Sequence, residues 1–204
     1  MARLPVGVAS QRAPEAPDDA ELVAAAAAGD RGAFQALYRR HLRAVHRRLT
    51  AIVGPVTERD DLTQQVFLDL HRALPRFRGE ARFSTFLHRI AINIACEHLE
   101  RHGRERRRRA PLDEAQLERL VAPAASPEAR ARHRQELAQV FALLEVLRPK
   151  QRIAFVLVAV EGLSLAEAGE LLRASADTVK QRVLAARREL AARIERSARR
   201  EEER

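Results

Sequence analysis

Two short helical patterns follow one another almost without a break within residues 147–190, and they leave few folds open to the chain. Ser164 and Glu167 form a capping-box pattern, in which each side chain satisfies the other residue's backbone N–H at a helix start. That helix should end near Leu172, and Ser175 should cap the next one. Two short helices joined by so few residues must cross steeply, which predicts a helix-turn-helix.

The residues just before this motif predict one more helix. Pro149 stands where a first helical position would be, because its missing N–H is not needed there. An apolar run over 153–160 follows and stops at Gly162. The run is too short for a membrane span and suits a buried helix.

The second helix of the motif has an apolar and a polar face. The apolar positions at helical spacing, which should pack inward, are Val179, Val183, Ala186, Leu190 and Ile194. The polar positions are Thr178, Lys180, Gln181, Arg182, Arg187 and Arg188. Such side chains can reach base edges, and the cationic ones can neutralise phosphates. The pattern favours DNA binding; the alternative is a solvated face on an ordinary helical hairpin.

Composition supports a nearly all-helical chain with a polyanionic partner. Helix formers dominate the 204 residues, and the formal net charge is +9. The fold class is therefore predicted as all-α, with two small helical domains joined by a flexible basic linker and the helix-turn-helix in the second domain. A single cysteine, Cys96, excludes an internal disulfide and suits a reducing cytoplasm. No signal segment opens the chain, so we expect a cytoplasmic protein without a membrane span.

The N-terminal half predicts a series of helices. Asp19 should cap the first helix, over 20–28, and a second should cover 31–53. A third should begin with the capping signal of Thr57 and Asp60 and end at Leu74. A fourth should run from Ser84 to about Arg101, and Gly103 should end it. Ser126 and Pro127 predict a later helix whose inner face carries Leu137, Val140, Phe141, Leu144 and Leu147. Between them, 104–109 holds five arginines, and 112–121 predicts a short helix.

These signals divide the chain into five parts. We expect a disordered leader over 1–18, a first domain over 19–103, a linker over 104–126, a helix-turn-helix domain over 127–196 and a charged tail over 197–204 that frays near its end.

Three stretches of the first domain carry possible chemistry. The helix after Asp60 presents Asp61, Gln64, Gln65 and Asp69 on a face with little basic character, which is either plain surface or a protein docking site. The loop 76–83, RFRGEARF, combines arginine with phenylalanine, as single-strand binders do; alternatively, its phenylalanines are buried anchors. Cys96, His98 and His102 lack a complete ligand set, so we expect no metal site.

Several stretches, taken in order, resemble the extracytoplasmic-function (ECF) group of bacterial sigma factors in the sigma-70 family. The resemblance covers about 19–195. It rests on DDLTQQVF at 60–67, FRGE at 77–80, FSTFLHRIAIN at 83–93, LRPKQR at 147–152, EGLS at 161–164 and TVKQR at 178–182.

The resemblance implies an RNA polymerase sigma factor, with core RNA polymerase and promoter DNA as partners and neither cofactor nor catalysis of its own. It places polymerase binding on Asp61, Gln64, Gln65 and Phe67. It places −10 recognition and strand opening on Arg76, Phe77, Arg78, Arg82, Asn93, His98 and Arg101. It places −35 recognition on Thr178, Lys180, Gln181, Arg182 and Arg187. Members of the group are often held inactive by an anti-sigma factor, and no residue here identifies one.

The chain departs from the family pattern at five positions. Gln65 stands where an acidic residue is usual, Phe86 where a tryptophan is usual and Ile92 where an arginine is usual. Arg173 occupies a turn where glycine is common, and a positive φ there would cost roughly 1 kcal/mol. Gly169 replaces a small alanine, which keeps close packing but lowers helix propensity. These changes bear on promoter preference.

Two other functions compete with this one. A helix-turn-helix regulator that acts without polymerase docking would bind duplex DNA by itself. A nucleic-acid enzyme would need carboxylates such as Asp60 and Asp61 in a catalytic arrangement, and their spacing matches no metal site or triad.

Overall fold

The computed structural model describes residues 18–56, 58–106 and 126–202. Within these ranges the chain is helical between turns and contains no strand, as the composition predicts. Almost all of the expected leader, Thr57 and the expected helix over 112–121 lie outside the described residues. No helix in the described ranges is long and apolar enough to cross a membrane.

The N-terminal body packs its helices around one apolar core. Its elements are α1 (Asp19–Ala27), α2 (Arg31–Val53), α3 (Arg59–Ala73), the 3-10 turn η1 (Leu74–Arg76) and α4 (Phe83–Arg106). Leu37, Leu49, Leu70 and Leu87 are fully buried in this core. Helix α2 has the predicted bounds because Asp30 caps its start and Gly54, at φ 91°, ends it.

The C-terminal body contains the helix-turn-helix. Its elements are α6 (Pro127–Leu144), α7 (Pro149–Phe155), the π-helical turn η2 (Val156–Val160), α8 (Leu165–Leu172) and α9 (Ala176–Glu202). Ser126 caps α6, and Pro149 begins α7, both as predicted. The apolar run after Pro149 is divided: α7 ends at Phe155, and a wider turn, closed by the bond from Glu161 N–H to the Val156 carbonyl, completes it.

Several predicted helix limits were wrong. Asp18, rather than Asp19, caps α1 by accepting from the N–H of Glu21. Helix α4 begins one residue before Ser84 and runs through Gly103 to Arg106, because a single glycine lowers helix propensity without breaking a helix. Helix α9 stays helical to Glu202, beyond the point where fraying was expected.

Two apolar residues predicted to face inward are exposed. Val140 on α6 is 50% exposed and Ile194 on α9 is 53% exposed. Ile194 lies in the last part of α9, where nearly every residue is exposed. Val140 lies in the packed part of α6, beside the buried Phe141 and Leu144, and points away from the core. Helical spacing therefore gives the inner face of each helix only approximately, and the tertiary structure decides which of its positions are covered.

The turn between α8 and α9 is unusually tight. Arg173 ends α8 in the left-handed conformation, with φ 48° and ψ 47°. The Ala174 N–H donates to the Gly169 carbonyl at 3.0 Å. A Cβ built on Gly169 would lie 2.7 Å from the Ala174 oxygen. Glycine is therefore required at this position, and an alanine would not fit the turn as it stands.

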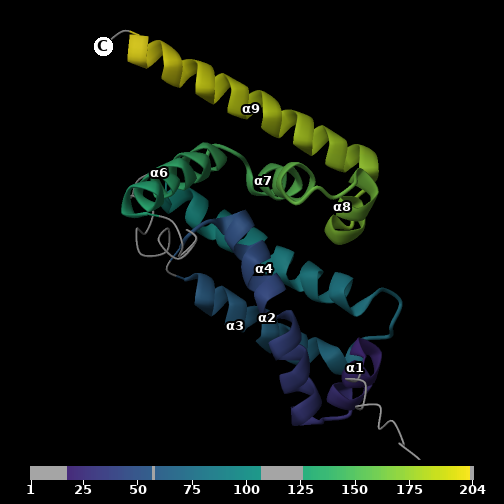
Figure 1. The fold of residues 1–204 in the computed structure, drawn as a ribbon. Helices are drawn as coiled ribbons and strands as arrows, with labels where there is room; N and C mark the ends of the chain where they lie inside the picture. Colours follow the sequence, from purple (N-terminus) through teal and green to yellow (C-terminus); the bar gives the residue numbers. More distant parts are fainter. Residues whose placement is uncertain (1–17, 57, 107–125, 203–204) are drawn as a thin grey trace, which may run out of the picture.

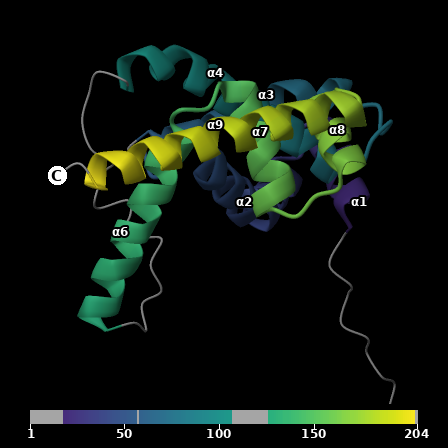
Figure 2. The same ribbon diagram turned by 90° about the horizontal axis from the view of Figure 1, so that it is seen from above.

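The two bodies pack directly on each other. Helix α4 of the N-terminal body lies against α7 and α8 of the C-terminal body. Helix α9 lies across α7 and α8 on the side away from the N-terminal body, where it forms the outermost layer (Figures 1 and 2). The polar face at the start of α9 is therefore open.

Candidate functional site

The first turns of α9 present a group of polar side chains on a rigid support. Ser175 caps the helix by accepting from the Thr178 N–H at 3.1 Å. Val179 and Ala186 are fully buried and Val183 nearly so, which fixes the rotation of the helix about its axis. The remaining positions point outward: Thr178, Lys180, Gln181 and Arg187 are exposed, and Arg182 is half-buried. The predicted −35 group thus lies on one helix, around the part of its circumference that the buried residues leave open.

Helix α8 is anchored at its start by the predicted capping box. The Ser164 N–H donates to Glu167 Oε2 at 2.9 Å, and the Glu167 N–H donates to Ser164 Oγ at 3.2 Å. The Ser164 hydroxyl also donates to Glu167 Oε2, at 2.6 Å, and this bond, followed by the bond from the Ser164 N–H, holds the pKa of Glu167 below its usual range. The box orients α8, whose buried Ala168 then allows α9 to pack closely across it.

The loop between η1 and α4 is held by aromatic contacts. Phe83 is 7% exposed and packs edge-on against Phe77 and His41, with ring centroids 6.2 Å and 5.2 Å apart. Half-buried Phe77 also stacks on Phe86 at 4.7 Å. The phenylalanines are therefore anchors of the loop, as one of the two sequence interpretations held. Phe77 is only partly buried, so this role does not exclude a contact with a base.

The arginines of this loop remain available to a ligand. Arg76, Arg78 and Arg82 are exposed, as are Asn93 and Arg101 on α4. His98 is different, since it is only 3% exposed and belongs to the core side of α4. The predicted −10 group, except for His98, is therefore exposed, but it extends from the loop along α4, and Arg101 lies about 27 Å along the helix from Phe83.

Helix α3 carries the predicted docking residues on one exposed stripe. Asp61, Gln64 and Gln65 are exposed. Gln65 donates to the Asp69 carboxylate at 2.8 Å, which fixes its amide. Phe67 is 4% exposed and packs on the ring of Tyr38 at 4.5 Å. It therefore supports the stripe from beneath.

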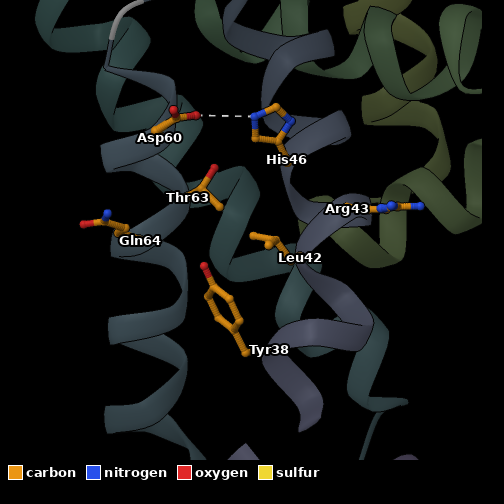
Figure 3. Close-up of a pocket in the computed structure, with 7 residues that line it drawn as sticks. All are labelled: Tyr38, Leu42, Arg43, His46, Asp60, Thr63 and Gln64. Atoms are coloured by element: carbon orange, nitrogen blue, oxygen red, sulfur yellow. Dashed lines mark ion pairs between the residues drawn. The ribbon is translucent and has the colours of Figure 1, made fainter. Parts of the chain in front are cut away.

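A groove of about 390 Å³ runs along the same stripe, between α2 and α3. Figure 3 shows Tyr38, Leu42 and His46 of α2 facing α3 across it. His46 Nε2 lies 3.4 Å from the Asp60 carboxylate at one end of the groove. Its other lining residues are Arg43, Thr63 and Gln64.

Sequence reasoning missed Leu68, which lies next to this stripe. Leu68 is 53% exposed, although it is a large apolar residue. It lies off the helix face that carries the inner positions Leu62, Val66 and Leu70. An apolar residue off the apolar face predicts an exposed side chain, so the sequence did contain a signal for it. A single exposed leucine is ordinary on a protein surface, and beside this stripe it offers apolar area for a partner to bury.

No metal centre emerges in the ranges the structure describes, where no three His, Cys, Asp or Glu residues gather. The Cys96 thiol donates to the Glu100 carboxylate, and burial together with this carboxylate raises its pKa. A raised pKa disfavours the thiolate, which is the form that binds metals and acts as a nucleophile.

A chain with a helix-turn-helix, an exposed polar recognition helix and a second helical body belongs to the DNA-binding proteins of transcription. Residues 37–105 match the family Sigma-70 region 2, and residues 137–190 match Sigma-70, region 4. The protein belongs to the ECF group of the sigma-70 family and is an RNA polymerase sigma factor for promoter-specific initiation. Its partners are core RNA polymerase and promoter DNA.

Curated relatives resemble it over most of their length. The ECF RNA polymerase sigma factor SigM of Mycobacterium tuberculosis is 36% identical, over 85% of this chain and 83% of the relative. The RNA polymerase sigma-H factor of Pseudomonas aeruginosa and the ECF RNA polymerase sigma-E factor of Escherichia coli are each 32% identical, over 83% of this chain and 90% of the relative. These likenesses do not favour the alternative of a regulator without polymerase docking.

Two solved structures share the fold. CnrH in complex with the cytosolic domain of CnrY is 29% identical with a TM-score of 0.59, over 87% of this chain and 97% of that one. RpoE of Bartonella quintana in complex with the anti-sigma factor NepR is 18% identical with a TM-score of 0.55, over 79% and 96% of the two chains.

Proposed function

We propose that three separate surfaces divide the work of this sigma factor. The α3 stripe of Asp61, Gln64 and Gln65, with Leu68 and the neighbouring groove, docks on core polymerase. The loop 76–83 and the exposed face of α4 recognise the −10 element and hold the opened strand. The first turns of α9 read the −35 element.

The observation that carries this assignment is the character of each surface. The start of α9 offers amide, hydroxyl and cationic groups on a helix that fits a major groove. The loop 76–83 offers arginines around a half-exposed ring, Phe77, which suits phosphates and an unstacked base. The α3 stripe offers amides, a carboxylate and an exposed leucine, which suits protein and repels DNA.

The buried positions of two predicted site residues give them supporting roles in this proposal. Phe67 holds the α3 stripe in place through Tyr38. His98 lies on the core side of α4 and supports the face that carries Asn93. Neither residue contacts a partner directly.

The cellular location and the absence of catalysis follow from the same proposal. A factor that binds polymerase acts in the bacterial cytoplasm and performs no chemistry itself. Both solved neighbours above are complexes with a second protein, and for one of them that protein is an anti-sigma factor. We include an anti-sigma factor among the partners of this chain on that ground.

Transcription in vitro tests the assignment. Core polymerase freed of other sigma factors is mixed with this protein and a pool of promoter fragments, and new transcripts that share one −10 and −35 pair are expected. Gln64→Ala should weaken core binding, whereas Gln181→Ala should leave core binding intact and change the −35 preference. Equal loss of core binding in both variants would contradict the division into surfaces.

A further inference from the structure

We propose that a hollow between the two bodies binds a small organic phosphate. This hollow, the junction pocket, lies between α2, α4 and η2 and has a volume of about 400 Å³. Pockets for small molecules usually measure about 300–1,000 Å³ and combine apolar walls with a few polar groups that fix the ligand. The residues assigned above to polymerase, to the −10 element and to the −35 element do not line this pocket. A ligand bound there would therefore add to the proposed function without depending on it.

Arg47 is the cation of the pocket that is free to meet a ligand. Its side chain is exposed and makes no hydrogen bond or ion pair within the described ranges. Helix α2, which carries Arg47, contains several arginines and no acidic residue, so its own helix offers no carboxylate to neutralise it. A guanidinium in this state presents a planar pair of N–H donors, which two phosphate oxygens can accept together.

The one carboxylate that lines the pocket is already engaged. Glu161 accepts from Arg48 Nε at 3.1 and 3.2 Å and from a terminal nitrogen of Arg48 at 2.5 Å. The two side chains are 13% and 20% exposed, so water screens this pair little. Two guanidinium groups and one carboxylate leave the lining with a net positive charge. An anion is therefore the ligand whose charge fits the pocket.

His88 adds an unsatisfied polar atom to the pocket. Its Nδ1 is buried and has no hydrogen-bond partner in the described part of the chain. Burial, followed by the charges of Arg48, His41 and Arg47, lowers its pKa from 6.5 to about 4, so the ring is neutral at pH 7. A neutral ring can carry its proton on Nδ1, which then donates to an oxygen of the ligand. A bound anion would satisfy this atom and offset the positive charges around it.

The remaining wall of the pocket is apolar and suits the organic part of the ligand. Val160, at the end of η2, is 62% exposed, although it is a large apolar residue. Ala44 and Ala51 of α2 are half-buried and line the same hollow. A ring joined to the phosphate could cover these side chains and remove their apolar surface from water. The combination favours a phosphomonoester with an aromatic or apolar body over inorganic phosphate.

NMR titration of the full-length protein with phenyl phosphate tests the proposal. The imidazole signals of His88, identified by their loss in His88→Gln, report on the pocket itself. We expect these signals to shift at millimolar phenyl phosphate. The pKa of His88 should rise by at least about one unit in the complex, because a neighbouring anion favours the charged ring. Orthophosphate should bind at least about tenfold more weakly, because it has no apolar part to place against Val160.

Two exposed arginines of the same helix provide a matched comparison. Arg47→Gln should weaken the binding of phenyl phosphate at least about tenfold, because it removes the free cation of the pocket. Arg39→Gln removes an equal charge outside the pocket and should leave the affinity unchanged. Circular dichroism checks that both variants are folded. His88 signals that do not move with phenyl phosphate, or an equal loss of affinity in the two variants, would overturn the proposal.

Discussion

Arg48 and Glu161 are 113 residues apart in the chain, yet their side chains form a two-pronged ion pair between the two bodies. His88 of α4 lies in the same interface, lining a pocket with both of them. Its buried Nδ1 has no hydrogen-bond partner in the part of the chain that the structure describes. The interface therefore contains a titratable ring beside a cation, and this arrangement makes the packing sensitive to acid.

Acid should destabilise the folded protein through His88. Burial, followed by the charges of Arg48, His41 and Arg47, lowers the pKa of His88 from 6.5 to about 4. Because the folded pKa lies below the unfolded one, the neutral ring is favoured in the fold. The stability it contributes is complete above pH 6.5 and is lost as the pH falls towards 4. After allowance for partial exposure, we expect a loss of about 2 kcal/mol.

Urea unfolding at pH 7 and pH 4.5 measures this effect. The free energy of unfolding should fall less between the two pH values in His88→Gln than in the parent protein, because the variant lacks the titrating ring. Identical pH dependence in both proteins would show that the ring is not desolvated.

Gly169→Ala should destabilise the protein although alanine is the better helix former. The change raises helix propensity by about 1 kcal/mol. The new Cβ would meet the Ala174 oxygen at 2.7 Å, so the turn must open. Overpacking of this kind typically costs about 1–3 kcal/mol, so the free energy of unfolding should fall overall. We expect the midpoint of a urea titration to move to a lower concentration. A net gain would mean that the turn relaxes freely.

Arg173→Gly should stabilise the same turn. Arg173 is the only residue other than glycine with positive φ in the described ranges. The left-handed conformation costs an L-residue about 1–2 kcal/mol, and glycine avoids this cost. Part of the gain is lost because glycine has more conformational freedom in the unfolded chain. We expect a rise of about 0.5–1 kcal/mol in the free energy of unfolding. Arg173→Ala, which removes the side chain but keeps the Cβ, should show no such rise.

Leu68→Ala should weaken polymerase binding more than it weakens the fold. The side chain is 53% exposed, so stability should change by no more than about 0.5 kcal/mol. If Leu68 is buried on docking, its loss should reduce affinity for core polymerase roughly tenfold, or about 1.4 kcal/mol. Leu68→Met, which keeps the apolar surface, serves as the control in the same titration. Equal affinities for parent and alanine variant would remove Leu68 from the docking surface.

The two kinds of DNA contact on α9 should separate in their salt dependence. Gln181→Ala should lower discrimination at one −35 base pair by about 1–3 kcal/mol and leave the salt slope unchanged. Arg187→Ala should weaken all sequences alike and reduce the slope of log K against log salt by about 1. Fluorescence anisotropy of the holoenzyme on matched and mismatched −35 duplexes, over a salt series, distinguishes them. The reverse pattern would exchange the two roles.

Local chemistry explains what could be predicted from the sequence by itself. The capping box of Ser164 and Glu167, the stop at Gly54 and the Pro149 start each depend on residues within one or two turns, so the helices around them have nearly the expected bounds. The same holds for the exposed stripe of Asp61, Gln64 and Gln65, because a helix distributes its residues over its faces by spacing alone.

Only the tertiary structure decided what each face meets. Val140 and Ile194 fit the apolar period and are exposed, Ile194 because the end of α9 is uncovered and Val140 because it points away from the core beside the buried Phe141. Phe67 and His98 were predicted to contact a partner and are buried. The pairing of Arg48 with Glu161 has no trace in local sequence, because it arises where two bodies meet. Helical spacing depends on residues within a few positions of each other. Burial and long-range pairing depend on which distant segments of the folded chain pack against each helix.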